Sequence, residues 1–215
     1  MPFSNHALDK YFVQGLSQLK EADIPDLEGE FQQSDHWINN FILNSIFRVS
    51  VGTESKPLVF AILRRAQMAL TEYQHGREAL LGYLQDPKRG VSAYFRALYH
   101  FEIVAALTYQ SYDIARKQVD VRLFNKGDGT PIQRLNRIYN VSKHLEPSSI
   151  PEGHLHAVWI NERGLAVGDA ELSWNELADL VRGIASMAEA LSNPEPVQDG
   201  EDKTNLSTTM TAIEA

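Results

Sequence analysis

The stretch LLGYLQDPKRGVSAY, residues 80–94, places a turn between two long helical patterns. Apolar residues recur at helical spacing before it, over residues 59–84, and after it, over residues 94–112. Residues 86–90 combine proline, charge and glycine, which end helices and form turns. Because so short a connection returns the chain on itself, the pattern predicts two long antiparallel helices as the spine of the fold.

Shorter helices are predicted on both sides of this spine. Apolar spacing predicts a helix over residues 5–22, followed by a proline-containing linker over residues 23–33. A second helix is expected to begin at the Ser34-Asp35 cap. The last helix opens with Ser173-Trp174-Asn175-Glu176, the spacing of a capping box, and continues with apolar residues at helical intervals.

One short region changes to the alternating pattern of a strand. Residues 155–167 alternate on both sides of Asn161-Glu162-Arg163-Gly164, which predicts a β-hairpin. The expected fold is therefore mainly α, an antiparallel helical bundle with a small β-hairpin before the last helix. We expect residues 1–33 to form an N-terminal helix and linker, residues 34–192 the helical domain, and residues 193–215 a disordered tail.

Composition limits the classes of function. The chain has 215 residues, 43% of them hydrophobic, enough for a substantial core. It contains no cysteine, which excludes disulfides, thiolate nucleophiles and cysteine zinc sites. Its uncharged apolar runs are far shorter than the roughly 20 residues that cross a bilayer. We therefore expect a cytoplasmic protein with no membrane partner.

The stretch RLNRIYNVSKH, residues 134–144, carries the most distinctive polar chemistry. At about 100° per residue, Arg137, Asn140 and His144 fall on one side of a helix. Leu135 and Ile138 fall on a neighbouring apolar stripe that can dock on a core. The pattern predicts an amphipathic helix that presents its polar side to solvent.

These three side chains suit phosphodiester chemistry. His144 can carry a proton near neutral pH, Arg137 can bind a phosphate through two donors, and Asn140 can orient a substrate oxygen. Such groups could deprotonate a 2′-hydroxyl and place positive charge beside a pentacovalent phosphorane. The alternative is that they are ordinary surface residues of an amphipathic helix.

Charge around this helix differs from that of the whole chain. The formal net charge is −8, which argues against a surface built for wholesale nucleic-acid binding. Residues 116–143, however, contain seven Lys and Arg residues against Asp120 and Asp128, a local charge of +5. The segment could form a positive patch beside the polar helix, or simply a solvated charged surface.

The long helical hairpin followed by Arg137-x6-His144 resembles the HEPN superfamily, over roughly residues 35–192. The resemblance implies an RNA-binding protein and metal-independent endoribonuclease of a bacterial defence or toxin type, acting as a homodimer. Arg137 and His144 would be its catalytic pair. The sequence departs from the family pattern at Ile138, where active members usually carry Asn, Asp or His, and Asn140 is the nearest candidate for that polar role.

The remaining site residues follow from the same resemblance. Arg134, Tyr139 and Lys143 lie on the motif helix and are expected to contact substrate, and no cofactor is expected. A second hypothesis is a non-catalytic helical module that binds a cognate protein partner or a nucleotide. Fold resemblance alone does not separate the two hypotheses.

Two further groups of ionisable residues have simpler interpretations. His154-x-His156, with His144 nearby in sequence, could form a three-histidine metal site, but this spacing is common by chance and we expect no metal. His100 and Glu102 lie within an apolar helical pattern. We expect them to be paired structural polar groups, together with Arg64, Arg65 and Glu72 on the helix opposite.

Overall fold

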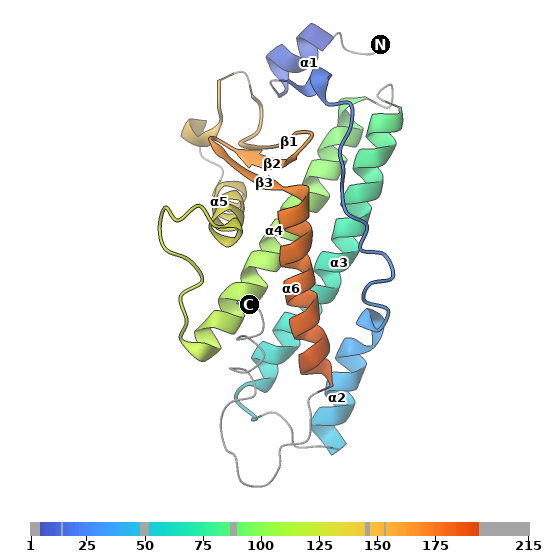
Figure 1. Ribbon diagram of the computed structural model, residues 1–215, viewed down its shortest axis with the longest axis vertical. Helices are drawn as coiled ribbons and strands as arrows, with labels where there is room; N and C mark the ends of the chain where they lie inside the picture. The colour runs from blue at the N-terminus through green and yellow to red at the C-terminus, as the bar shows by residue number, and fades with distance from the viewer. Residues whose placement is uncertain are drawn as a thin grey trace.

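The two long predicted helices form the spine of the molecule. The computed structural model describes residues 5–13, 15–47, 52–86, 90–144, 147–152 and 154–193. Helix α3 spans Lys56–Gln85, with Pro57 in its first turn, and helix α4 spans Val91–Val119. They lie side by side along the long axis of the molecule (Figure 1). The inward stripe of α4 is buried, which confirms the predicted antiparallel pair.

Three further helices pack on this spine. Helix α6, Trp174–Ser192, packs on α3 and begins with the predicted capping box, in which Ser173 and Glu176 bond to each other's backbone nitrogens. Helix α2, Trp37–Phe47, follows a short 3-10 turn over Ser34–His36 and packs on α6 and α3. Helix α5, Pro131–Lys143, lies on α4 and beside the sheet.

The β region contains the hairpin predicted over residues 155–167, extended by a third strand to a three-stranded antiparallel sheet. Its strands are β1 (Val158–Ile160), β2 (Gly164–Val167) and β3 (Ala170–Ser173), in that order. Val167 pairs with Ala170, so Gly168 and Asp169 form a two-residue turn, and Gly168 has a φ of 58°. Glycine followed by aspartate is a recognised signal for such turns. The third strand was missed because β3 leads directly into the capping box of α6.

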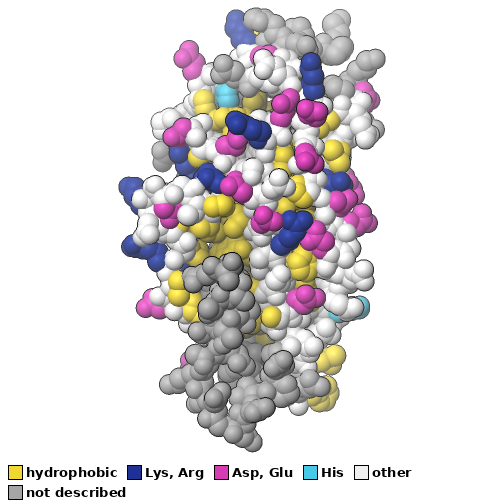
Figure 2. Space-filling view, viewed as in Figure 1, with side chains coloured by type: hydrophobic (Ala, Val, Ile, Leu, Met, Phe, Trp, Pro, Cys, Tyr) yellow, Lys and Arg dark blue, Asp and Glu magenta, His cyan; other side chains and the backbone are white. Residues whose placement is uncertain are grey.

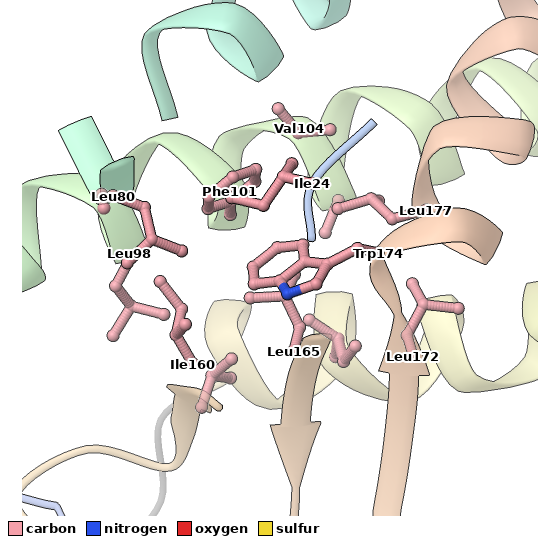
Figure 3. Packing of buried hydrophobic residues seen from close by; sticks show 14 of the residues in the cluster. Ile24, Leu80, Leu98, Phe101, Val104, Ile160, Leu165, Leu172, Trp174 and Leu177 are labelled. Atoms are coloured by element: carbon pink, nitrogen blue, oxygen red, sulfur yellow. The ribbon is translucent and has the colours of Figure 1, made fainter. Parts of the chain in front are cut away.

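The sheet is fixed to one end of the bundle by a shared core. Trp174, the first residue of α6, lies among Phe101 of α4 and Leu165 of β2 (Figure 3). The buried hydroxyl of Tyr94 accepts a hydrogen bond from the amide of Ile160 at 2.8 Å and donates one to the carbonyl of the same residue at 3.3 Å. Burial raises the pKa of Tyr94, so this hydroxyl stays protonated and holds β1 on α4.

The N-terminal region departs from the predicted helix and linker. Helix α1 covers only Asn5–Tyr11, and Gly15, with a φ of 80°, precedes a short 3-10 turn over Leu16–Gln18. Residues 19–33, here called the N-terminal strap, then run along the bundle, without regular structure over residues 19–27 and as turns over residues 28–33 (Figure 1). Ile24 and Leu27 of the strap are buried in the main core. The segment expected to be a linker is therefore part of the hydrophobic core.

Hydrogen bonds and an ion pair hold the strap on helices α3 and α6. The hydroxyl of Tyr73 donates to the carbonyl of Pro25 at 3.1 Å, and Nε of Arg77 donates to the carbonyl of Ile24 at 3.2 Å. Arg182 of α6 binds both carboxylate oxygens of Glu30 at 2.8 Å.

Two sequence-based expectations concern the ends of the chain and the membrane. The predicted tail over residues 193–215 lies, apart from Asn193, outside the described residues. Within the part of the chain that the structure describes, no helix has the length and apolarity needed to cross a bilayer.

Candidate functional site

Helix α5 forms where the sequence predicts it, with one buried and one exposed side. The hydroxyl of Thr130 caps its first turn by accepting from the amide of Gln133. Leu135 and Ile138 are fully buried, while Arg137 and Asn140 are exposed. Because Ile138 points into the core, the position directly after Arg137 cannot supply a polar group to the exposed side.

Arg137 lies against the turn between β2 and β3. Its Nη1 is 2.6 Å from Oδ1 of Asp169, and the hydrogen bond from Arg137 holds the pKa of Asp169 below its ordinary value. A Cβ on Gly168 would come within 2.8 Å of Nη2 of Arg137, so the glycine gives the guanidinium room. The side chains of Arg137 and Asp169 are 47% and 87% exposed. Water screens an ion pair this exposed, so a ligand anion can compete with Asp169 for Arg137.

Asn140 and His144 continue along the exposed side of α5. The side-chain amide of Asn140 donates to Oδ1 of Asn136 at 3.0 Å. His144 caps the C-terminus of the helix through its backbone amide, and its imidazole is exposed. At 1.5 Å per residue, Arg137 and His144 are separated by about 10 Å along the helix axis. The structure thus places all three residues on one exposed side but spreads them along it.

The three residues expected to contact substrate have different surroundings. Arg134 is only a quarter exposed and binds Glu176 of α6 and the carbonyl of Gly129, so it joins α5 to the last helix. Tyr139 stacks on Tyr109 of α4, with ring centroids 5.1 Å apart. Nζ of the exposed Lys143 lies 5.7 Å from the centre of the partly buried Tyr139 ring.

Ion pairs within α4 and between elements offset much of the local positive charge. Arg116 and Lys117 both bind Asp113, which precedes the +5 segment, and Arg134 and Arg137 bind Glu176 and Asp169, which follow it. Figure 2 shows basic side chains interspersed with acidic ones on the face in view. The predicted positive patch is therefore reduced to a mixed surface around α5.

A second polar cluster joins α5 to α4 and to the segment before β1. Oγ of Ser142 donates to Oε1 of Glu102 at 2.6 Å, and Nε2 of His156 lies 3.9 Å from the same oxygen. Ser142 therefore bonds to the carboxylate and not to an imidazole, so the cluster lacks the serine–histidine contact that activates a nucleophile. Its geometry is that of a structural network, as expected for Glu102.

His154 and His156, which the sequence suggests as conceivable metal ligands but which we expect to bind no metal, belong to no group with metal-site spacing among the described residues. The ring of His154 packs edge-on against Trp159, with centroids 4.6 Å apart, and burial lowers its pKa. Nδ1 of His156 faces the backbone of Val158. Among the described residues, one group has the spacing of a metal site, and it consists of Glu72, His75 and His100. Sequence analysis treated Glu72 and His100 as structural and missed His75, although Glu72-x-x-His75 is a ligand spacing known from helical bundles.

The chain matches no protein-family model, no curated protein and no solved structure. Its function therefore has to be inferred from the side chains described above.

Proposed function

We propose that the protein is an RNA-binding, metal-independent endoribonuclease whose working surface is the exposed side of α5. The observation that carries this proposal is the joint exposure of Arg137, Asn140 and His144 on a helix anchored by buried Leu135 and Ile138. These side chains can change partners without opening a cavity in the core. The position of Lys143 beside the Tyr139 ring adds a cation and an aromatic surface for RNA.

The proposed chemistry uses one proton transfer on each side of the scissile phosphate. A neutral His144 removes the proton of the 2′-hydroxyl, and the 2′-oxygen attacks phosphorus to form a 2′,3′-cyclic phosphate. The bond from phosphorus to the 5′-oxygen breaks, and a protonated imidazole gives that oxygen its proton. Arg137 stabilises the charge on the phosphorane, and Asn140 orients a phosphate oxygen.

A homodimer supplies the second imidazole. One chain has a single His144, and about 10 Å of helix separates it from Arg137, so one phosphate is contacted more easily by groups from two copies. This arrangement corresponds to the HEPN-like dimer implied by the sequence resemblance. The antiparallel pair of α3 and α4, with α5 and α6 packed on it, is compatible with such a bundle. A role in bacterial defence or as a toxin belongs to the same proposal.

One observation favours a second candidate, a non-catalytic module that binds a protein partner or a nucleotide. Arg137 already binds a carboxylate of its own chain, Asp169. A permanent pair of this kind positions the β2–β3 turn and leaves Arg137 unable to stabilise a phosphorane. The two candidates therefore differ in whether Asp169 releases Arg137 when RNA is present.

The test is cleavage of mixed RNAs by the full chain in the presence of a chelator. We expect wild type to cleave, with products ending in a cyclic phosphate, and Arg137→Ala and His144→Ala to lose activity while keeping the wild-type circular dichroism. Arg122→Ala and His36→Ala are matched controls, since both residues are exposed and lie outside α5. If wild type cleaves no RNA, or if all four variants cleave equally, the ribonuclease proposal fails and the binding module takes its place.

A further inference from the structure

We propose that Glu72, His75 and His100 bind one divalent metal ion of the borderline class, represented by Zn²⁺. Glu72 and His75 come from the middle of α3, and His100 comes from α4 opposite. One donor atom from each of the three side chains lies within 4.8 Å of the other two. This site is independent of α5 and goes beyond the proposed ribonuclease, which uses no metal.

The backbone places the three donors together. Glu72 and His75 are three residues apart, so they lie on the same side of α3. Gly76 follows them and lets the helices approach, because a Cβ at this position would come within 3.2 Å of the Cβ of His100 and of the Phe101 ring. His100 thereby reaches across to Glu72, and its Nδ1 lies 2.6 Å from Oε2.

The donor atoms of Glu72 and His100 are almost as far apart as two ligands of one metal ion. Around tetrahedral zinc, nitrogen and oxygen ligands lie about 2.0–2.2 Å from the ion, which puts donor atoms about 3.4 Å apart. Glu72 and His100 therefore need to separate by less than about 1 Å. His75 is exposed and free to rotate toward them, and its ring is already 5.5 Å from that of His100, at 61° to it.

In the contact between Glu72 and His100, a hydrogen occupies a position that a metal cation can take instead. A hydrogen bond between a carboxylate oxygen and an imidazole nitrogen requires one proton between them. Zinc binds a carboxylate and a neutral imidazole, so an ion bound through Nδ1 takes the place of this hydrogen, and the imidazole then carries its hydrogen on Nε2. The side chains of Glu72 and His100 are only 15% and 19% exposed, so water competes weakly for the ion.

The donor set selects the class of ion. Imidazole nitrogen favours zinc and its transition-metal neighbours, whereas magnesium and calcium prefer oxygen ligands alone. Three protein ligands leave one tetrahedral position open for water or a substrate, which is typical of catalytic zinc sites more than of structural ones. The ion would at the same time link the middle of α3 to the first half of α4.

Titration of tag-free, chelator-treated full-length protein with Zn²⁺ by calorimetry tests the proposal. We expect one Zn²⁺ per chain in wild type, and at least about 100-fold weaker binding in His75→Ala and Glu72→Gln. His36→Ala removes an exposed histidine elsewhere and should bind like wild type. His75→Ala removes an exposed side chain and is therefore expected to keep the fold.

Three outcomes would overturn the site. They are the absence of Zn²⁺ binding by wild type, equal affinity in wild type, His75→Ala and Glu72→Gln, and Mg²⁺ binding as tight as that of Zn²⁺. Arg137→Ala separates this proposal from the ribonuclease. It should bind Zn²⁺ like wild type even though it is expected to lose RNA cleavage in chelator.

Discussion

Helix α5 and the N-terminal strap are both polar segments at the edge of the bundle, yet their side chains are used differently. The strap has no regular helix and buries Ile24 and Leu27 in the main core. Helix α5 is regular and amphipathic, and two of its arginines form ion pairs with residues that follow it in the chain. The comparison shows that a segment without regular apolar spacing in its sequence can still be buried in the core.

The largest effect is expected from Ile24→Ala in the strap. Ile24 is 5% exposed, and truncation of a buried isoleucine removes apolar contacts and leaves a cavity. We expect the free energy of unfolding to fall by about 2–4 kcal/mol, measured by urea denaturation. Ile46→Ala is the matched control, because Ile46 is 65% exposed and its loss should change little. Equal stability of the two variants would show that the strap is a loose linker after all.

A smaller effect is expected from Arg134→Ala on α5. The Arg134–Glu176 pair is partly shielded from water and joins α5 to α6, so its loss should reduce stability by about 1–2 kcal/mol, between the values of exposed and buried pairs. Arg137→Ala is the comparison on the exposed side, and we expect its melting temperature to equal that of wild type. The reverse order of stability would mean that Arg137, not Arg134, holds the helix.

Acid should weaken the attachment of α5 to α6 through Glu176. Burial by itself would raise the pKa of this carboxyl, but hydrogen bonds from the amide and hydroxyl of Ser173 and the charge of Arg134 outweigh burial and lower the pKa below 4.5. Because this pKa is lower in the folded state than in the unfolded state, the carboxylate stabilises the protein at pH values above its unfolded-state pKa. This stabilisation is lost as the pH falls through the folded-state pKa. We expect the stability advantage of wild type over Glu176→Gln to shrink as the pH falls below the ordinary pKa of a glutamate carboxyl. An advantage that is constant with pH would contradict this role of the carboxylate.

The smallest effect on folding is expected from Asp169→Asn. The carboxylate is almost fully exposed, so we expect an unchanged melting temperature and a few-fold tighter binding of RNA, because Arg137 is released. Asp179→Asn removes the same charge from another exposed position and serves as the control in a fluorescence binding assay. If both variants gain equally, the change reflects net charge alone and not the release of Arg137.

Much of the helical fold could be predicted from local patterns. The spacing of apolar residues predicts α3, α4, α5 and α6, and the capping box predicts the start of α6 within one turn. The burial of the strap could not be predicted, because Ile24 and Leu27 lie in the segment expected to be a linker and have no regular apolar spacing. Their burial depends on Tyr73, Arg77 and Arg182, which are distant in the chain.

The candidate sites show the same limit. The exposure of Arg137, Asn140 and His144 follows from 100° per residue, but their partners do not, since Asp169 comes from a turn that sequence analysis did not recognise. The contact between Glu72 and His100 joins residues 28 positions apart and depends on the register of two antiparallel helices. A short turn predicts that the helices run side by side, but not which residues meet.

The direct passage from β3 into α6 also determines how the molecule can open. Ser173 is both the last residue of β3 and the cap of α6, so no linker separates the sheet from the bundle. The sheet cannot detach without unravelling the first turn of the helix and withdrawing Trp174 from the core. We therefore expect the sheet and α6 to behave as one cooperative unit, whose amide hydrogens exchange with solvent only through a common opening. The turn that carries Asp169 thus belongs to this cooperative unit, even though the Asp169 side chain itself is almost fully exposed.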